Sequence, residues 1–294
     1  MDERESLARR FEGHRSRLRA VSYRMLGSLS EADDAVQEAW VRLDRAGAAE
    51  IENLGAWLTT VAGRVCLNML ESRRARREEP LVRVPDPVVS FAHGIDPEQE
   101  ALLGESVGLA LLVVLEELTP PERIAFVLHD VFAVPFDEVA TVVGRSPAAA
   151  RQLASRARRR VRGASARTDA DPGRQREVVS AFLEAARGGD FDALLSVLDP
   201  DVLLRTDRGS ASADAPSFVR GARDVASGAM LASGLVRSAQ VALVNGAAGI
   251  VSWGSGGRPF SVMAFTVEGG KIVAIDVLAD PERLGRLGLP AVDD

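Results

Sequence analysis

The sequence predicts a multidomain protein in which two all-α domains precede a C-terminal α+β domain. Three observations favour this architecture: helical hydrophobic periodicity up to residue 163, strand-like patterns after about residue 200, and breaks rich in proline or small residues between them. We therefore assign the domains to residues 1–78, 96–163 and 174–294, joined by linkers at 79–95 and 164–173. Of the 294 residues, 46% are hydrophobic, which suffices for a core in each domain.

The composition excludes several classes of protein. A single cysteine, Cys66, cannot build an intramolecular disulfide framework and fits a cytoplasmic, reducing location. No apolar run is long enough to span a membrane, and the charged N-terminus does not resemble a signal peptide. His14, His93 and His129 lack the spacing of metal ligands, so we expect neither a metal nor another cofactor.

The first domain is expected to contain three amphipathic helices. The second of them, starting at Ser30, has an acidic outer face, and the third ends in a basic cluster. The acidic face consists of Asp33, Asp34, Gln37 and Glu38, and the basic cluster of Arg73, Arg74, Arg76 and Arg77. Trp40 and Trp57 fall at apolar positions and are expected in the core. An acidic face followed by a basic helix suggests one protein partner and one nucleic-acid partner.

Residues 119–163 predict a helix-turn-helix. Thr119, followed by Pro120 and Glu122, has the pattern of a helix N-terminus with a capping box. The helix beginning at Phe136 is expected to end at Gly144, which adopts left-handed backbone angles without strain. Ser146 then caps a further helix, so the order is short helix, glycine turn and second helix. In this motif the second helix enters the major groove of DNA.

The second helix of the motif is strongly basic. Residues 144–163 contain seven arginines and no acid, although the chain has a net charge of −6. A solvated helix end that complements the helix dipole explains about two or three arginines but not this number. We expect base reading from Arg151 and Gln152 and phosphate binding from most of the arginines. The predicted DNA-binding residues in this segment are Arg145, Ser146, Arg151, Gln152, Ser155, Arg156, Arg158 and Arg159.

Together these segments resemble an extracytoplasmic-function (ECF) sigma factor of the sigma-70 family. "GSLSEADDAVQEAWVRL" (27–43) is similar to region 2.2, "AWLTTVAGRVCLNMLESRRARR" (56–77) to regions 2.3 and 2.4, and "LTPPERIAFVLHDVFAVPFDEVATVVGRSPAAARQLASRARRRV" (118–161) to region 4. The resemblance covers about residues 5–162, in order and with the expected spacing.

The resemblance implies two partners, core RNA polymerase and promoter DNA. Region 2 would dock on the β′ clamp helices through Asp33, Asp34, Gln37 and Glu38, and region 4 would meet the β flap. Region 2 would also recognise and melt the −10 element, with Arg64, Asn68, Arg73, Arg74 and Arg77 near the DNA and the loop at about 46–55 near a flipped base. Region 4 would read the −35 element. Opening a promoter requires cations along the backbone and a pocket for an extruded base.

Residues 174–294 predict two helices hinged at Gly188–Gly189, a strand, a helix near 222–233 and a final group of strands. Asn245-Gly246 marks a tight hairpin turn. Helices followed by a curved antiparallel sheet suggest a cone-shaped fold. The segment resembles the SnoaL-like domain that follows the sigma regions in one group of ECF sigma factors.

That group carries regulatory motifs, which this chain matches in part. Its Asp-Gly-Gly-Gly motif corresponds to Asp207-Arg208-Gly209-Ser210, and its Asn-Pro-Asp-Lys-Leu motif corresponds loosely to residues 280–284. The group's Trp-Leu-Pro-Glu-Pro linker motif is not found near 79–87, where "EPLVRVPDP" stands. The resemblance implies a regulatory surface formed by Asp207, Asn245, Gly246, Asp280, Pro281 and Leu284.

Alternative functions stay open for the whole chain and for its last domain. A free-standing transcriptional regulator with a sensor domain would share the helix-turn-helix, but it has no use for the region 2-like block. An enzymatic C-terminal domain is disfavoured because no histidine or cysteine follows His129. Arg205, Asp207 and Asp276 could line a pocket, and sensing of an unidentified small ligand and a purely structural role are equally open. We expect no catalytic residues.

Overall fold

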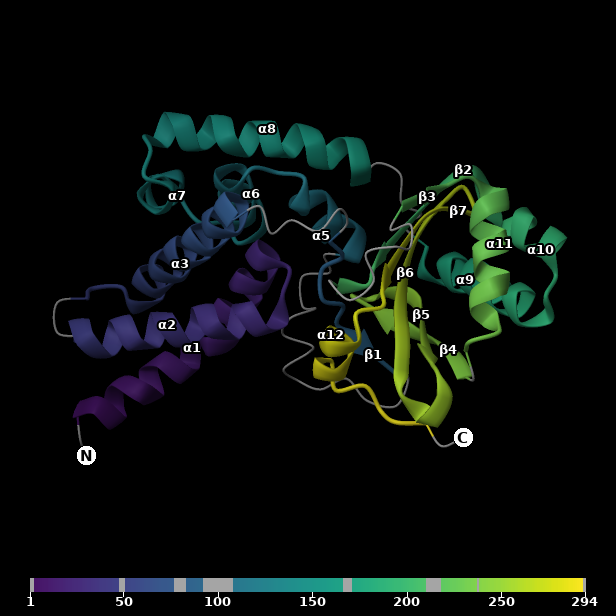
Figure 1. Cartoon of the computed structure of the whole chain (residues 1–294). Helices are drawn as coiled ribbons and strands as arrows, with labels where there is room; N and C mark the ends of the chain where they lie inside the picture. Colours follow the sequence, from purple (N-terminus) through teal and green to yellow (C-terminus); the bar gives the residue numbers. More distant parts are fainter. Residues whose placement is uncertain are drawn as a thin grey trace. The chain divides into compact units, whose positions relative to one another are not determined.

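The computed structural model describes residues 3–47, 51–76, 83–91, 108–165, 171–209, 218–236 and 238–292. The chain divides into two units (Figure 1). The first unit comprises Met1–Glu79, Pro97–Gly104 and Val114–Ala164, and the second comprises Pro80–Asp96, Glu105–Val113 and Ser165–Asp294. None of the described helices has the length and apolar character needed to cross a membrane.

The first unit begins with three packed helices, α1 (Glu3–Leu26), α2 (Leu29–Ala46) and α3 (Leu54–Arg76). Their shared core contains Phe11, Leu18, Val36, Ala39, Leu43, Leu54, Leu58 and Ala62. Trp40 and Trp57 pack against this core. The second helix begins at Leu29 rather than at Ser30, because the Ser28 hydroxyl accepts from the backbone N–H of Glu31 and acts as the N-cap.

The second half of this unit contains the predicted helix-turn-helix. It consists of α6 (Pro120–Phe126), a π-helix η1 (Val127–Val131), α7 (Phe136–Val143) and α8 (Pro147–Ser165). The preceding helix, α5 (Leu109–Glu116), belongs to the second unit up to Val113 and to the first unit from Val114. The capping box of Thr119 and Glu122 is present, and Gly144 ends α7 with φ of 63°. The π-helix was not predicted, because its residues continue an ordinary helical pattern. It ends where Ala133 adopts φ of 54°.

The second unit contains a seven-stranded sheet with the strand order β1-β4-β5-β6-β7-β2-β3. The pairs are antiparallel except β2–β7, which is parallel. The strands are β1 (Val89–Ser90), β2 (Leu198–Asp207), β3 (Phe218–Arg220), β4 (Ser238–Val244), β5 (Ala247–Trp253), β6 (Pro259–Glu268) and β7 (Lys271–Leu278). Asn245 and Gly246, with φ of 50° and 79°, form the predicted turn between β4 and β5.

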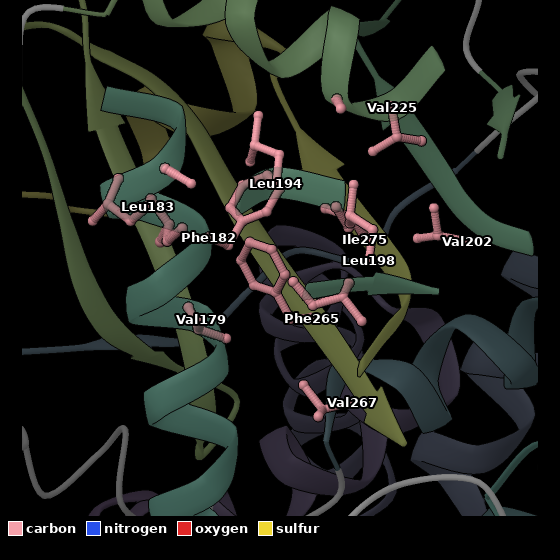
Figure 2. Close-up of a cluster of buried hydrophobic side chains, with 14 of the residues drawn as sticks. Val179, Phe182, Leu183, Leu194, Leu198, Val202, Val225, Phe265, Val267 and Ile275 are labelled. Atoms are coloured by element: carbon pink, nitrogen blue, oxygen red, sulfur yellow. The ribbon is translucent and has the colours of Figure 1, made fainter. Parts of the chain in front are cut away.

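Helices α9 (Pro172–Gly188), α10 (Phe191–Val197) and α11 (Ala222–Ser233) supply side chains to one core shared with the sheet. Figure 2 shows Phe182 of α9 and Phe265 of β6 in this core, and their ring centroids lie 5.3 Å apart. Leu194, Val202 and Val225 are almost fully buried in the same cluster. Helices and sheet of this α+β domain therefore share one hydrophobic cluster. A short helix, α12 (Pro281–Arg286), follows the last strand.

Candidate nucleic-acid interface and linker site

The outer face of α2 contains both exposed and paired acidic groups. Asp34 and Gln37 are exposed. Asp33 accepts a hydrogen bond from Arg19 at 2.6 Å, and Glu38 accepts one from Arg42 at 2.9 Å, although both carboxylates remain partly accessible. The predicted polymerase-docking residues thus share one surface, on which nearby arginines reduce part of the negative charge.

The basic residues of α3 fall into different environments. Asn68 and Arg74 are exposed, whereas Arg77 lies outside the described residues. Arg73 points inward: its Nε donates to Glu31 at 3.1 Å, its Nη1 donates to the Leu26 carbonyl at 3.2 Å, and its side chain is only 13% exposed. The expectation that Arg73 contacts DNA is therefore revised, because its guanidinium joins α3 to the start of α2.

Arg64 is exposed on α3 but is engaged by the helix-turn-helix. Its Nη2 and Nε donate to the Thr141 carbonyl of α7 at 3.0 and 3.3 Å. The neighbouring Gly63 allows close approach, since a Cβ at this position would lie 3.0 Å from a methyl group of Val142. In this arrangement two nitrogens of the exposed Arg64 guanidinium are engaged by the Thr141 carbonyl.

A hollow of about 450 Å³ lies where α2 ends and α3 begins. It is lined by Ala46, Gly47, Ile51, Glu52, Asn53 and Trp57. Asn53 is held in place because its side-chain oxygen accepts from the backbone N–H of Ala56 at 3.0 Å, which leaves its amide hydrogens as donors. The lining of the hollow includes residues of the loop at about 46–55, which the resemblance placed near a flipped base.

On α8 and in the turn before it, several of the predicted DNA-binding side chains face outward. Arg145, Arg151, Gln152, Ser155 and Arg159 are all exposed. The Ser146 hydroxyl instead accepts from the backbone N–H of Ala149 at 3.2 Å and acts as the helix cap. The exposed residues form one polar and basic surface along the helix.

Other arginines of α8 have acidic partners inside the domain. Arg156 and Arg160 donate to Glu122 at 2.8 and 2.7 Å, and Arg158 pairs with Asp130 at 2.9 Å. Burial alone would raise the pKa of Glu122, but hydrogen bonds from Arg156 and Thr119 and the charge of Arg160 hold that pKa below its usual value. These pairs connect α8 to α6 and η1, while the side chains of Arg156 and Arg158 stay 46% and 37% exposed, so their binding to phosphate stays a prediction.

An ionic cluster of the second unit surrounds Arg283. Its Nε lies 2.7 Å from Asp86, its Nη1 lies 2.6 Å from Asp207, and its Nη2 donates to the Val84 carbonyl at 2.6 Å. Burial disfavours the charged guanidinium, but the carboxylates of Asp86 and Asp207 outweigh burial and raise the pKa of Arg283. Asp207 also accepts from the backbone N–H of Val84 at 3.0 Å. Residues 83–91, in the predicted linker, are thus part of this domain.

A second contact holds the same segment at the hairpin turn. The side-chain oxygen of Asn245 accepts from the Val88 N–H at 3.0 Å, and the Asn245 N–H donates to the Val88 carbonyl at 2.8 Å. Immediately after this contact, Val89 and Ser90 pair with β4 as strand β1. Each of these backbone hydrogen bonds requires an extended chain, which the two prolines at 85 and 87 favour.

The remaining predicted regulatory residues lie beside this cluster. Asp280 caps α12 by accepting from the Glu282 N–H at 2.9 Å, Pro281 takes the first helical position, and Leu284 is buried. A Cβ at Gly209 would collide with Asp280, at 2.3 Å from its carboxylate oxygen. The structure therefore brings the parts of the chain around Asp207, Asn245 and Asp280 to linker residues 83–91.

Sequence reasoning missed three residues of this site, Val84, Asp86 and Arg283. A signal was present in Val84-Pro85-Asp86-Pro87, which keeps the proline-acid-proline order of the linker motif with aspartate in place of glutamate. Arg283 likewise supplies a cation where the C-terminal motif has lysine. The departures from the motifs therefore preserve charge at both ends of the ion pair.

Arg205 and Asp276, considered as pocket residues, form an ion pair across the parallel strands β2 and β7. Arg205 Nε lies 2.6 Å from Asp276, which is 2% exposed. Burial raises the pKa of Asp276 although Arg205 opposes this shift. In the described residues no group of three or more His, Cys, Asp or Glu side chains is arranged to hold a metal ion.

A helix-turn-helix with an exposed basic helix, preceded in the chain by a separate three-helix domain, defines a DNA-binding protein of the sigma-70 type. Residues 10–76 match the model of Sigma-70 region 2, and residues 108–161 match that of Sigma-70, region 4. The chain is 41% identical over 289 residues to the ECF RNA polymerase sigma factor SigJ of Mycobacterium tuberculosis, covering 93% of this chain and 91% of SigJ. It is 34% identical to the probable ECF RNA polymerase sigma factor SigI of the same species, covering 98% of both chains.

The structure gives the same result. The crystal structure of Mycobacterium tuberculosis SigJ superimposes with a TM-score of 0.74 at 38% identity, covering 97% of this chain and all of that one. The chain therefore belongs to the ECF RNA polymerase sigma factors. The predicted order of two helical sigma domains and a C-terminal SnoaL-like α+β domain is confirmed.

Proposed function

We propose that the chain binds core RNA polymerase through region 2 and directs it to promoters that both sigma regions read. The observation that supports this most directly is the exposed surface of the helix-turn-helix, which presents Arg145 in the turn and Arg151, Gln152 and Arg159 on α8. The outer face of α2 supplies the protein-binding surface that a free-standing regulator would not need. Because RNA polymerase works in the cytoplasm, the protein acts there.

Docking on polymerase predicts a charge-dependent interaction. Reversing the charge in the double variant Asp34→Arg and Glu38→Arg should weaken binding to core RNA polymerase at least tenfold, because like charges would then face the β′ clamp helices. The fold should survive, since exposed charges contribute about 0–1 kcal/mol to stability. The measurement is titration of labelled sigma factor with core enzyme.

Glu12→Arg is the matched control, because Glu12 is an exposed acid on a different helix, α1. Among the described contacts it pairs only with Arg15 of the same helix. The control should bind polymerase as the native chain does. Equal affinity of the double variant and the control would contradict docking through α2.

The hollow between α2 and α3 is proposed to receive the base that is extruded from the −10 element. Glu52 and Asn53 supply hydrogen-bonding groups, and Trp57 belongs to the lining although it packs against the core. Asn68 and Arg74 are exposed on the following helix and lie close enough in sequence to bind the adjoining strand. Arg64 joins them only after it leaves the Thr141 carbonyl.

We further propose that the C-terminal domain modulates sigma activity through the linker. Residues 83–91 connect region 2 to region 4, and the domain holds them through Arg283, Asp207 and Asn245. While the linker is held, the freedom of the two sigma regions to separate is reduced. Arg64 of region 2 donates to the Thr141 carbonyl of region 4 when the two regions are together. Their separation would therefore also release Arg64 for DNA binding.

This proposal predicts altered transcription when the linker contacts are removed. We expect promoter activity of Asp207→Ala and of a form ending at about residue 168 to differ from the full chain in the same direction, because both lose the hold on the linker. Run-off transcription with saturating core polymerase measures the effect, and core affinity measured in parallel separates docking from modulation. Identical activity of all three forms would show that the domain has no part in control.

A further inference from the structure

A stack of three side chains joins η1, α7 and α8 within the helix-turn-helix. The rings of His129 and Phe136 are stacked, with centroids 3.7 Å apart and planes inclined by 27°. The guanidinium carbon of Arg151 lies over the Phe136 ring at 5.4 Å from its centroid. This distance is within the range of a cation–π interaction.

The backbone fixes the orientation of the stack. His129 Nδ1 lies 2.9 Å from the Val134 carbonyl, and because the carbonyl can only accept, the Nδ1 carries the hydrogen. Val134 in turn donates its backbone N–H to Leu128 at 2.9 Å, and Ala133 between them has φ of 54°. The segment after the π-helix is therefore hydrogen-bonded back to Leu128 and His129, and these contacts hold the imidazole against Phe136.

The stack holds Arg151 in a way that the other arginines of α8 are not held. Arg156, Arg158 and Arg160 each pair with a carboxylate, which offsets part of their charge. An aromatic ring contacts the face of a guanidinium and leaves its N–H edge available to an acceptor. Arg151 is exposed, so it is oriented and still able to donate.

A guanidinium edge with this freedom matches the O6 and N7 acceptors of guanine in the major groove, the commonest specific contact of arginine. Orienting a long side chain before binding removes part of the ordering cost of the complex. We propose that Phe136, supported by His129, is a positioning residue that holds Arg151 for bidentate recognition of a guanine in the −35 element. This inference rests on the proposed promoter-reading function of region 4.

The test uses holoenzyme assembled from the full chain and core RNA polymerase. It is incubated with promoter DNA randomised through the −35 element, and the retained DNA is sequenced. We expect the native chain to enrich guanine at one position and Arg151→Ala to lose that enrichment. Phe136→Leu should reduce it about three- to tenfold, because the arginine is no longer ordered before binding. Phe136→Tyr, which keeps the ring, should restore it.

The salt dependence of DNA binding separates positioning from loss of a phosphate contact. Phe136→Leu should leave the log–log salt slope unchanged, whereas the control Arg159→Ala should lower its magnitude by about 0.9 without changing the guanine preference. Native guanine enrichment that persists in Phe136→Leu, or that falls equally in Phe136→Tyr, would overturn the positioning role. If the native holoenzyme shows no preference at any −35 position, the proposed function of region 4 fails instead.

Discussion

Replacing Arg283 with alanine is expected to release residues 83–91 from the C-terminal domain. The substitution leaves the carboxylates of Asp86 and Asp207 in a buried site without their cation, and their side chains are only 9% and 4% exposed. Removing one partner of a buried ion pair typically costs about 3–5 kcal/mol. Hydrogen exchange should therefore accelerate at Val84 and Val88, whose N–H groups are bonded to Asp207 and Asn245.

Arg286→Ala is a matched control, because Arg286 lies on the same helix and its partner Glu282 is exposed. Such a surface pair contributes about 0–1 kcal/mol, so exchange in the linker should not change. The double variant Asp86→Ala with Arg283→Ala should be less damaging than the two single losses added together, since the charges disappear as a pair. Native exchange rates in Arg283→Ala would show that the ion pairs do not hold the linker.

Replacing Glu122 with alanine is expected to loosen the helix-turn-helix. Glu122 is buried, it completes the capping box with Thr119, and it binds Arg156 and Arg160 of α8. Because both arginines are about half exposed, solvent screens part of their interaction, and we expect a loss of about 2 kcal/mol of unfolding free energy. Urea unfolding followed by hydrogen exchange in α6 and α8 measures this loss.

The same residue gives a prediction for the pH dependence of stability. The pKa of Glu122 is lower in the folded chain than its usual value of 4.5, so its ionised form favours folding. Its contribution is complete above that value and is lost as the pH falls through the lower folded pKa. The difference in stability between the native chain and Glu122→Gln should therefore shrink on acidification below about pH 4.5.

Local patterns in the sequence predicted much of the fold because they depend on neighbours in the chain. The capping box at Thr119, the left-handed Gly144 and the Asn245-Gly246 turn all follow from backbone preferences of short segments. Periodicity likewise placed Phe11, Leu58 and Phe182 in cores, since one face of a helix must leave water. The π-helix at Val127–Val131 was missed, because its residues continue an ordinary helical pattern that does not reveal the i+5 hydrogen bond from the Phe132 N–H to the Val127 carbonyl.

The sequence by itself determined the domain order, the helix-turn-helix and the excess of arginine on its second helix. Only the tertiary structure decided which arginines have an acidic partner. Arg156, Arg158 and Arg160 meet Glu122 and Asp130 from 28 or more positions away in the chain, and Arg73 meets Glu31. Likewise, 197 positions separate Asp86 from Arg283. Spacing along one helix or strand shows which side chains share a face. An ion pair between two elements also requires that the folded chain bring those elements together. Only the tertiary structure therefore shows whether a given charge meets a partner or solvent.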